Sequence, residues 1–196
     1  MNHNRLNAEM ILGARAWICR LGNTITGTGG ESNTVSDALM PEPPESYANP
    51  GDWTCLGKIR TAKPQTDHKT ADVEGVDDTG AYKVTELKLV TKRKLLFATN
   101  DITPEAFEMT FGLTAPIEDG VEQAVFASGS DSIEVWMCFE LTDAYRTQTG
   151  LARIAVRGKL SLQNPLEAKS DPAEAAYELS IQPNALSTFV SEGLVA

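Results

Sequence analysis

Alternating apolar and polar positions mark two strands in the second half of the chain. In residues 131–141 the apolar face comprises Ile133, Val135, Met137, Phe139 and Leu141, and the mixed face comprises Ser132, Glu134, Trp136, Cys138 and Glu140. In residues 153–162 the apolar face comprises Ile154, Val156, Leu160 and Leu162, opposite Arg153, Arg157 and Lys159. This pattern is typical of antiparallel strands that cover a core on one side. If the two strands pair, the basic row lies across from Glu134 and Glu140, which would help to set their register.

Turn signals divide the region before these two strands into further runs. Residues 53–62 form one run that ends at Lys63-Pro64, and residues 65–73 form a second that ends at Glu74-Gly75. Residues 82–98 predict a long strand or hairpin arm, with Leu87, Leu89, Leu95 and Phe97 on one face. A last strand is expected at residues 175–182.

A short helix is expected after the long strand. Thr103 is placed as its N-cap, Pro104 suits the first helical position, and Glu105 is favoured by the N-terminal dipole. The helix should end near Gly112, with Phe107 and Phe111 on its buried face.

The chain is expected to form a single domain over residues 1–196. Residues 1–52 are interpreted as an N-terminal arm and long loop around a short element at 11–20, residues 53–182 as the β core, and 183–196 as a C-terminal arm. The predicted fold class is mostly β: a β-sandwich or open barrel of antiparallel strands with one short flanking α-helix.

Charge and cysteine usage exclude several classes of function. With 27 acidic and 17 basic residues the 196-residue chain carries −10, which argues against nonspecific nucleic-acid binding. Cys19, Cys55 and Cys138 lie too far apart for a CxxC motif and are odd in number, so buried reduced thiols are expected. No apolar run approaches the ~20 residues that span a bilayer, and the start lacks a signal core, so we expect synthesis in the cytosol and no membrane partner.

A search for catalytic or metal-binding residues predicts neither activity nor cofactor. Histidine occurs only at His3 and His68, and neither lies in a metal-ligand spacing. Glu134 and Glu140 would lie roughly 20 Å apart on one strand, too far to act on one bond. The acidic cluster of Asp67, Asp72, Glu74, Asp77 and Asp78 could bind a divalent cation, but it does not fit an EF-hand loop, and an exposed acidic loop is favoured.

Lys92-Arg93-Lys94 is the concentrated basic run of the chain. It is either a solvated strand segment or a contact with an acidic surface, such as another copy of this protein. In the second case Lys92, Arg93 and Lys94 are candidates for a subunit interface, together with Asp67, Asp72, Asp77 and Asp78 of a neighbour.

The order of these features resembles the tail tube proteins (major tail proteins) of long-tailed bacteriophages. The resemblance covers roughly residues 38–162 and rests on five features: a short N-terminal element, a proline-bearing loop, an aromatic-then-Leu-Gly strand, a long extended segment, and a turn into a helix followed by strands. The segments are Ala38-Leu39-Met40-Pro41, Trp53-Thr54-Cys55-Leu56-Gly57-Lys58-Ile59, residues 84–97, and residues 102–112.

The resemblance implies a non-enzymatic β-sandwich with a flanking helix, which forms rings that stack into a hollow tube. Its partners would be further copies of itself, other phage tail proteins, and DNA that passes through the lumen without specific binding. It would reside in the virion tail after assembly in the host cytoplasm. Physical reasoning agrees in one respect, because long edge strands suit a repeated interface.

Two alternatives remain. An enzyme would need convergent polar groups in a pocket, for which the sequence offers no constellation. A monomeric β-sandwich module that binds sugar or peptide could use Trp17, Trp53 and Trp136 as platforms. Size in solution discriminates the module from a tube protein, because the module stays monomeric.

Overall fold

A computed structural model describes residues 13–26, 31–44, 50–76, 79, 82–113, 120, 122, 131–142, 150–164, 166 and 174–191. The strands of this part of the chain are β1 (Gly13–Arg20), β2 (Thr24–Thr26), β3 (Ser32–Thr34), β4 (Thr54–Val76), β5 (Tyr82–Thr99), β6 (Ser132–Thr142), β7 (Gly150–Leu162), β8 (Ala175–Ile181) and β9 (Thr188–Ser191). Its helix is α1 (Pro104–Phe111).

Six strands close into a ring. Their order is β6-β1-β4-β5-β8-β7, and β7 pairs again with β6, so the sheet returns to its first strand. All these pairings are antiparallel. Strand β9 adds to β7, and β2 and β3 form a separate two-stranded sheet. The prediction of a mostly β, antiparallel fold with one short helix is confirmed.

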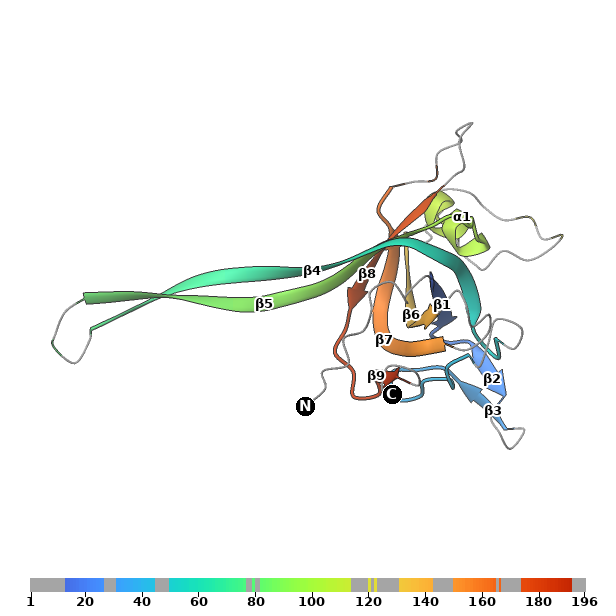
Figure 1. Cartoon of the computed structure of the whole chain (residues 1–196), viewed down its shortest axis with the longest axis horizontal. Helices are drawn as coiled ribbons and strands as arrows, with labels where there is room; N and C mark the ends of the chain where they lie inside the picture. Colours follow the sequence, from blue (N-terminus) through green and yellow to red (C-terminus); the bar gives the residue numbers. More distant parts are fainter. Residues whose placement is uncertain are drawn as a thin grey trace, which may run out of the picture.

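The β4–β5 hairpin extends far beyond this ring (Figure 1). The two strands pair from Ile59↔Thr99 to Val76↔Tyr82, with register shifts between Ile59 and Thr61 and between Asp67 and His68. Strand β1 pairs with β4 only up to Lys58, and β8 pairs with β5 only from Arg93. We call residues 59–76 and 82–92 the arm; the expected hairpin arm at 82–98 is confirmed.

The expected chain breaks at Lys63-Pro64 and Glu74-Gly75 are wrong, because β4 runs through both as one strand of 23 residues. Proline lacks an N–H and is tolerated in a strand where a neighbouring strand is missing. Pro64 lies beyond the stretch that β1 pairs with, so its missing donor costs no hydrogen bond on that edge.

The interior of the ring holds the main hydrophobic core. Phe97 lies at its centre, stacked on Tyr177 at 5.1 Å between ring centroids and edge-on to Phe139 at 5.6 Å. Fully buried neighbours from five ring strands are Ile18, Leu56, Met137, Leu160 and Leu179. The apolar faces that alternation predicted for β6 and β7 therefore point into this core.

Most of the mixed face of β6 is also buried, with Glu134 as its exposed member, which the one-sided interpretation did not predict. Trp136, Cys138 and Glu140 are each at most 2% exposed. A second cluster covers them, built from Ile25 of β2, Val35 after β3, and the tryptophans Trp17 and Trp53. Alternation along one strand cannot show that a distant segment packs on its polar side.

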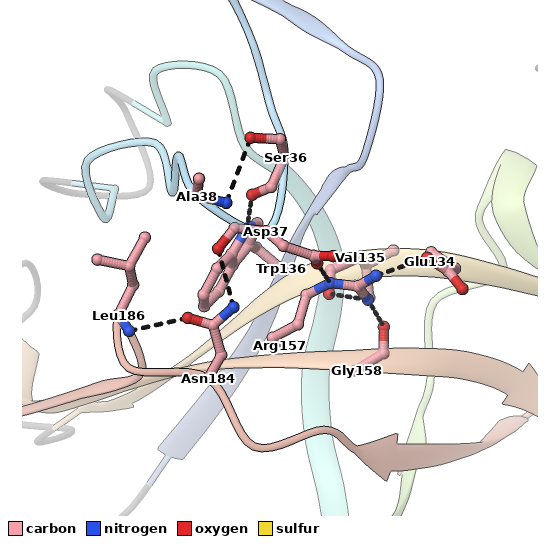
Figure 2. A network of polar contacts seen from close by, with 10 residues as sticks. All are labelled: Ser36, Asp37, Ala38, Glu134, Val135, Trp136, Arg157, Gly158, Asn184 and Leu186. Atoms are coloured by element: carbon pink, nitrogen blue, oxygen red, sulfur yellow. Dashed lines mark hydrogen bonds and ion pairs between the residues drawn. The ribbon is translucent and has the colours of Figure 1, made fainter.

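One buried arginine ties this covering layer to the sheet (Figure 2). Arg157 of β7 is 2% exposed and binds Asp37 through Nε at 2.6 Å and Glu134 of β6 through Nη2 at 2.5 Å. Its Nη1 donates to the backbone oxygen of Gly158 at 2.6 Å. The indole N–H of Trp136 donates to the backbone oxygen of Ser36 at 2.9 Å, so two ring strands hold the 36–39 turn.

The helix begins and ends where its sequence predicted. Thr103 has extended backbone angles at the N-cap, and Gly112 has a φ of 59°, the left-handed conformation that glycine adopts most easily. The predicted buried face is wrong: Phe107 is 40% exposed and stacks on Phe111.

The buried face of α1 instead carries Glu105, Ala106, Glu108 and Met109. Glu108 pairs with Arg20 of β1, so an ion pair, in addition to apolar contacts, orients the helix on the ring.

Candidate assembly surface

The described part of the arm has little buried surface. From Arg60 to Ala71 every side chain is exposed except that of Asp67, which is half-buried. A two-stranded hairpin alone is marginally stable in water and normally needs a third strand or a packed layer. No third strand pairs with the described arm within one subunit, and the described side chains at residues 60–71 and 92 are exposed or half-buried, so the strand edges and these side chains are open to a neighbour.

The structure places Lys92, Arg93 and Lys94 at the base of the arm. Lys92 and Arg93 are exposed. Lys94 pairs within its own chain, with Glu178 of β8 at 2.9 Å and Asp67 of β4 at 3.8 Å. The hydrogen bond from Lys94 to Glu178, and then the charges of Glu178 and Asp67, raise the pKa of Lys94.

The acidic candidates do not form one cluster. Asp67 lies at the base of the arm, opposite Lys92 in the β4–β5 register, whereas Asp72 lies farther out, opposite Glu86. Asp77 and Asp78 lie outside the described residues. The structure thus brings Asp67 to the basic run within one subunit and leaves the intersubunit role of all seven candidates a prediction.

Three further cations, which the sequence did not predict as part of this site, belong to the same region. Arg60, Lys63 and Lys69 lie on β4, separated from the basic run by more than twenty residues of chain, and the antiparallel register returns β5 beside them. We call Arg60, Lys63, Lys69, Lys92, Arg93 and Lys94 the basal cluster. The spacing of these residues along the chain shows no relation between them. Only the β4–β5 pairing reveals that they lie in one region.

The proposed aromatic platforms are not available at the surface. Trp17, Trp53 and Trp136 are 1%, 3% and 0% exposed. The indole N–H of Trp53 donates to the backbone oxygen of Glu42 at 2.6 Å, and that of Trp17 to Glu140 at 3.3 Å. The hypothesis that these tryptophans form binding platforms is therefore wrong, and the binding-module alternative loses its support.

The thiols lie apart and are free. Burial raises the pKa of Cys138 to about 12, and burial with the charge of Asp52 raises that of Cys19 to about 11. Cys55 lines a shallow pocket with Arg15, Gly57, Lys58 and Asp101, and burial raises its pKa as well. High thiol pKa values disfavour the thiolate, so these cysteines lack the character of nucleophiles.

Among the residues that the structure describes, no three His, Cys, Asp or Glu side chains are grouped so that they could hold a metal ion. The same part of the chain contains no helix that is long and apolar enough to cross a membrane.

Comparisons with known proteins give only distant likenesses. No family model matches the chain, and no curated protein matches it. Among solved structures, the chain is similar to the tube-terminating cap of the anti-feeding prophage, with a TM-score of 0.37 and 11% identity over 84% of this chain and 97% of that one.

Two further similar structures come from an extracellular contractile injection system called PVC. Its sheath-tube complex is similar with a TM-score of 0.37 and 11% identity over 78% of this chain and 92% of that one. Its sheath/tube terminator is similar with a TM-score of 0.35 and 10% identity over 90% of this chain and 94% of that one. TM-scores this low do not indicate a function for this chain.

Proposed function

We propose that this protein is a structural subunit that assembles into stacked rings and forms the hollow tail tube through which phage DNA passes. The observation that carries the proposal is the β4–β5 arm, which leaves the ring with both strand edges unpaired along its described length. The order of sequence features that resembles phage tail tube proteins supports the choice of a tube over other assemblies.

The length of the arm favours contact with a neighbour. β8 pairs with β5 as far as Arg93, which lies opposite Thr66, so the free hairpin begins at residue 67. At ~3.3 Å per residue, residues 67–76 carry its described end roughly 30 Å beyond the ring. Unpaired edge groups at that distance form a template that another chain can complete. A contact between the arm of one copy and a different surface of the next is heterologous, and its repetition generates a ring or a helical filament.

The remaining parts of the proposal follow from the same resemblance. The assembled protein would reside in the virion tail, contact other tail proteins, and let DNA pass without specific binding. The excess of acidic residues suits this last role, because an acidic wall makes no salt-sensitive contacts with phosphates.

Electron microscopy of the purified protein with a shortened arm as comparison tests the proposal. In the variant, residues 67–92 are replaced by Asn-Gly, which closes a two-residue hairpin next to the register pair Thr66↔Arg93. All pairs of β1 with β4 and of β8 with β5 are kept, so the ring should still fold, as far-UV circular dichroism would show.

The intact protein should form rings or tubes in negative stain, and the shortened variant should sediment as a monomer. An intact protein that stays monomeric at every concentration would contradict the proposal. Rings formed equally well by the shortened variant would remove the arm from the interface.

A further inference from the structure

Opposite charges are separated on this subunit. The basal cluster supplies six cations, and Asp67, Glu174 and Glu178 beside it supply three carboxylates, so the base of the arm carries +3. Because the whole chain carries −10, the remainder carries −13. The arm thus starts from a cationic region on an acidic protein.

Several cations of the basal cluster form no ion pair with a described carboxylate of their own subunit. Arg60 pairs with Glu174, and Lys94 pairs with Glu178 and Asp67. Among the described residues, no carboxylate forms an ion pair with Lys63, Lys92 or Arg93, and all three side chains are exposed. None of the three is directly opposite another in the β4–β5 pairing: Lys92 lies opposite Asp67, Arg93 opposite Thr66 and Lys63 opposite Leu96. A carboxylate-bearing partner would supply the opposite charge that these exposed cations lack.

We propose that the basal cluster docks against the carboxylate-bearing surface of a second copy of this protein, an inference that rests on the proposed self-assembly. A second copy offers the required chemistry, because everything outside the base of the arm is acidic on balance. Nucleic acid is a poorer partner, since its phosphates would meet the −13 of the remaining surface around a +3 region.

This docking reverses the salt dependence that the net charge alone predicts. Two subunits that each carry a net charge of −10 repel each other. Added salt screens this repulsion and would therefore speed association through an uncharged interface. Docking of a cationic cluster on an acidic surface steers encounter, and salt then slows it. Between about 0.1 M salt, with a Debye length of ~10 Å, and about 1 M, with ~3 Å, the association rate should fall roughly tenfold.

Two variants with the same change in net charge test the site. Arg93→Glu lies in the basal cluster, and Thr24→Glu/Ser32→Glu adds two negative charges at exposed positions of the separate β2–β3 sheet. Initial association rates, measured by light scattering, should fall at least tenfold at low salt for Arg93→Glu and about twofold for Thr24→Glu/Ser32→Glu. The salt dependence should change sign only in Arg93→Glu. Circular dichroism of both variants reports whether they fold.

Three outcomes would overturn the inference. They are an intact protein whose association speeds up with salt, equal rates in the two variants, and duplex DNA that binds the cluster while association is unchanged in Arg93→Glu. In each of these cases rings in negative stain would leave the proposed function standing. Absence of rings at every salt concentration would instead count against the function itself.

Discussion

The guanidinium of Arg157 donates from Nε to the carboxylate of Asp37, 120 residues earlier in the chain, at 2.6 Å. Arg157 is almost fully buried, whereas the side chains of its two carboxylate partners are 71% exposed for Asp37 and 54% for Glu134. The arginine is therefore the buried partner, and the carboxylates neutralise it from the protein surface.

This asymmetry predicts strongly nonadditive mutations. Asp37→Asn and Glu134→Gln should each cost about 1 kcal/mol of unfolding free energy, because one carboxylate still neutralises the arginine. The double variant should cost about 3–5 kcal/mol, because it leaves a buried charge uncompensated. Urea unfolding of the four proteins gives the coupling. Additive costs would show that Arg157 is neutralised by other groups.

Gly57 should not tolerate alanine. Its φ is +108°, and an added Cβ would overlap the side chain of Asp101. The backbone alone should cost about 1–3 kcal/mol, and the overlap adds to it. Gly51→Ala is the control, with a φ of +60° and open space, and should cost about 1 kcal/mol. Thermal unfolding compares the stability of the two variants. The double variant Gly57→Ala/Asp101→Gly should regain only the stability that is lost to the overlap, because the backbone strain at residue 57 remains.

Stability should decline in alkaline solution. The folded pKa of Cys138 is about 12 against 9.0 in the unfolded chain, so the native thiol keeps a proton that the unfolded one loses. Its contribution is complete below pH 9 and falls as pH rises toward 12, by roughly 1 kcal/mol per pH unit.

Cys19 also lowers the stability of the fold as the pH rises, from pH 9 up to its folded pKa of about 11. Cys138→Ala isolates the first contribution, because this variant should lose stability less steeply than the wild type in chemical unfolding between pH 9 and 11. Identical slopes would mean that Cys138 is not desolvated in solution.

The tryptophans should be shielded within a single subunit. Because Trp17, Trp53 and Trp136 are each at most 3% exposed, acrylamide should quench native fluorescence several-fold less than unfolded fluorescence. The measurement belongs on the shortened-arm variant, so that assembly does not contribute shielding. Oligosaccharides or peptides should leave the emission unchanged. Strong native quenching would restore the aromatic platforms of a binding module.

Local signals determined several elements of this protein. Alternation in residues 131–141 and 153–162 predicted β6 and β7 and their inward apolar faces, and the pairing of Glu134 with Lys159 and of Glu140 with Arg153 follows the expected basic row. Pro104 and Gly112 located the helix ends, since these signals depend on residues within one turn. Thr103 occupies the N-cap position, but its side chain forms no capping hydrogen bond. The long strand before the helix was likewise visible as a periodic run.

Tertiary structure alone decided which faces are covered and which residues meet. The pairing of β1 with β6 and of β5 with β8, the burial of Trp136 and Arg157, and the assembly of the basal cluster all join segments far apart in the chain. Alternation reports the two faces of a strand but not what packs on each of them. From the sequence alone, a charged residue on a mixed face, such as Arg157, is therefore predicted to be exposed to solvent. Only the tertiary structure shows that a distant segment, here the turn that carries Asp37, covers it.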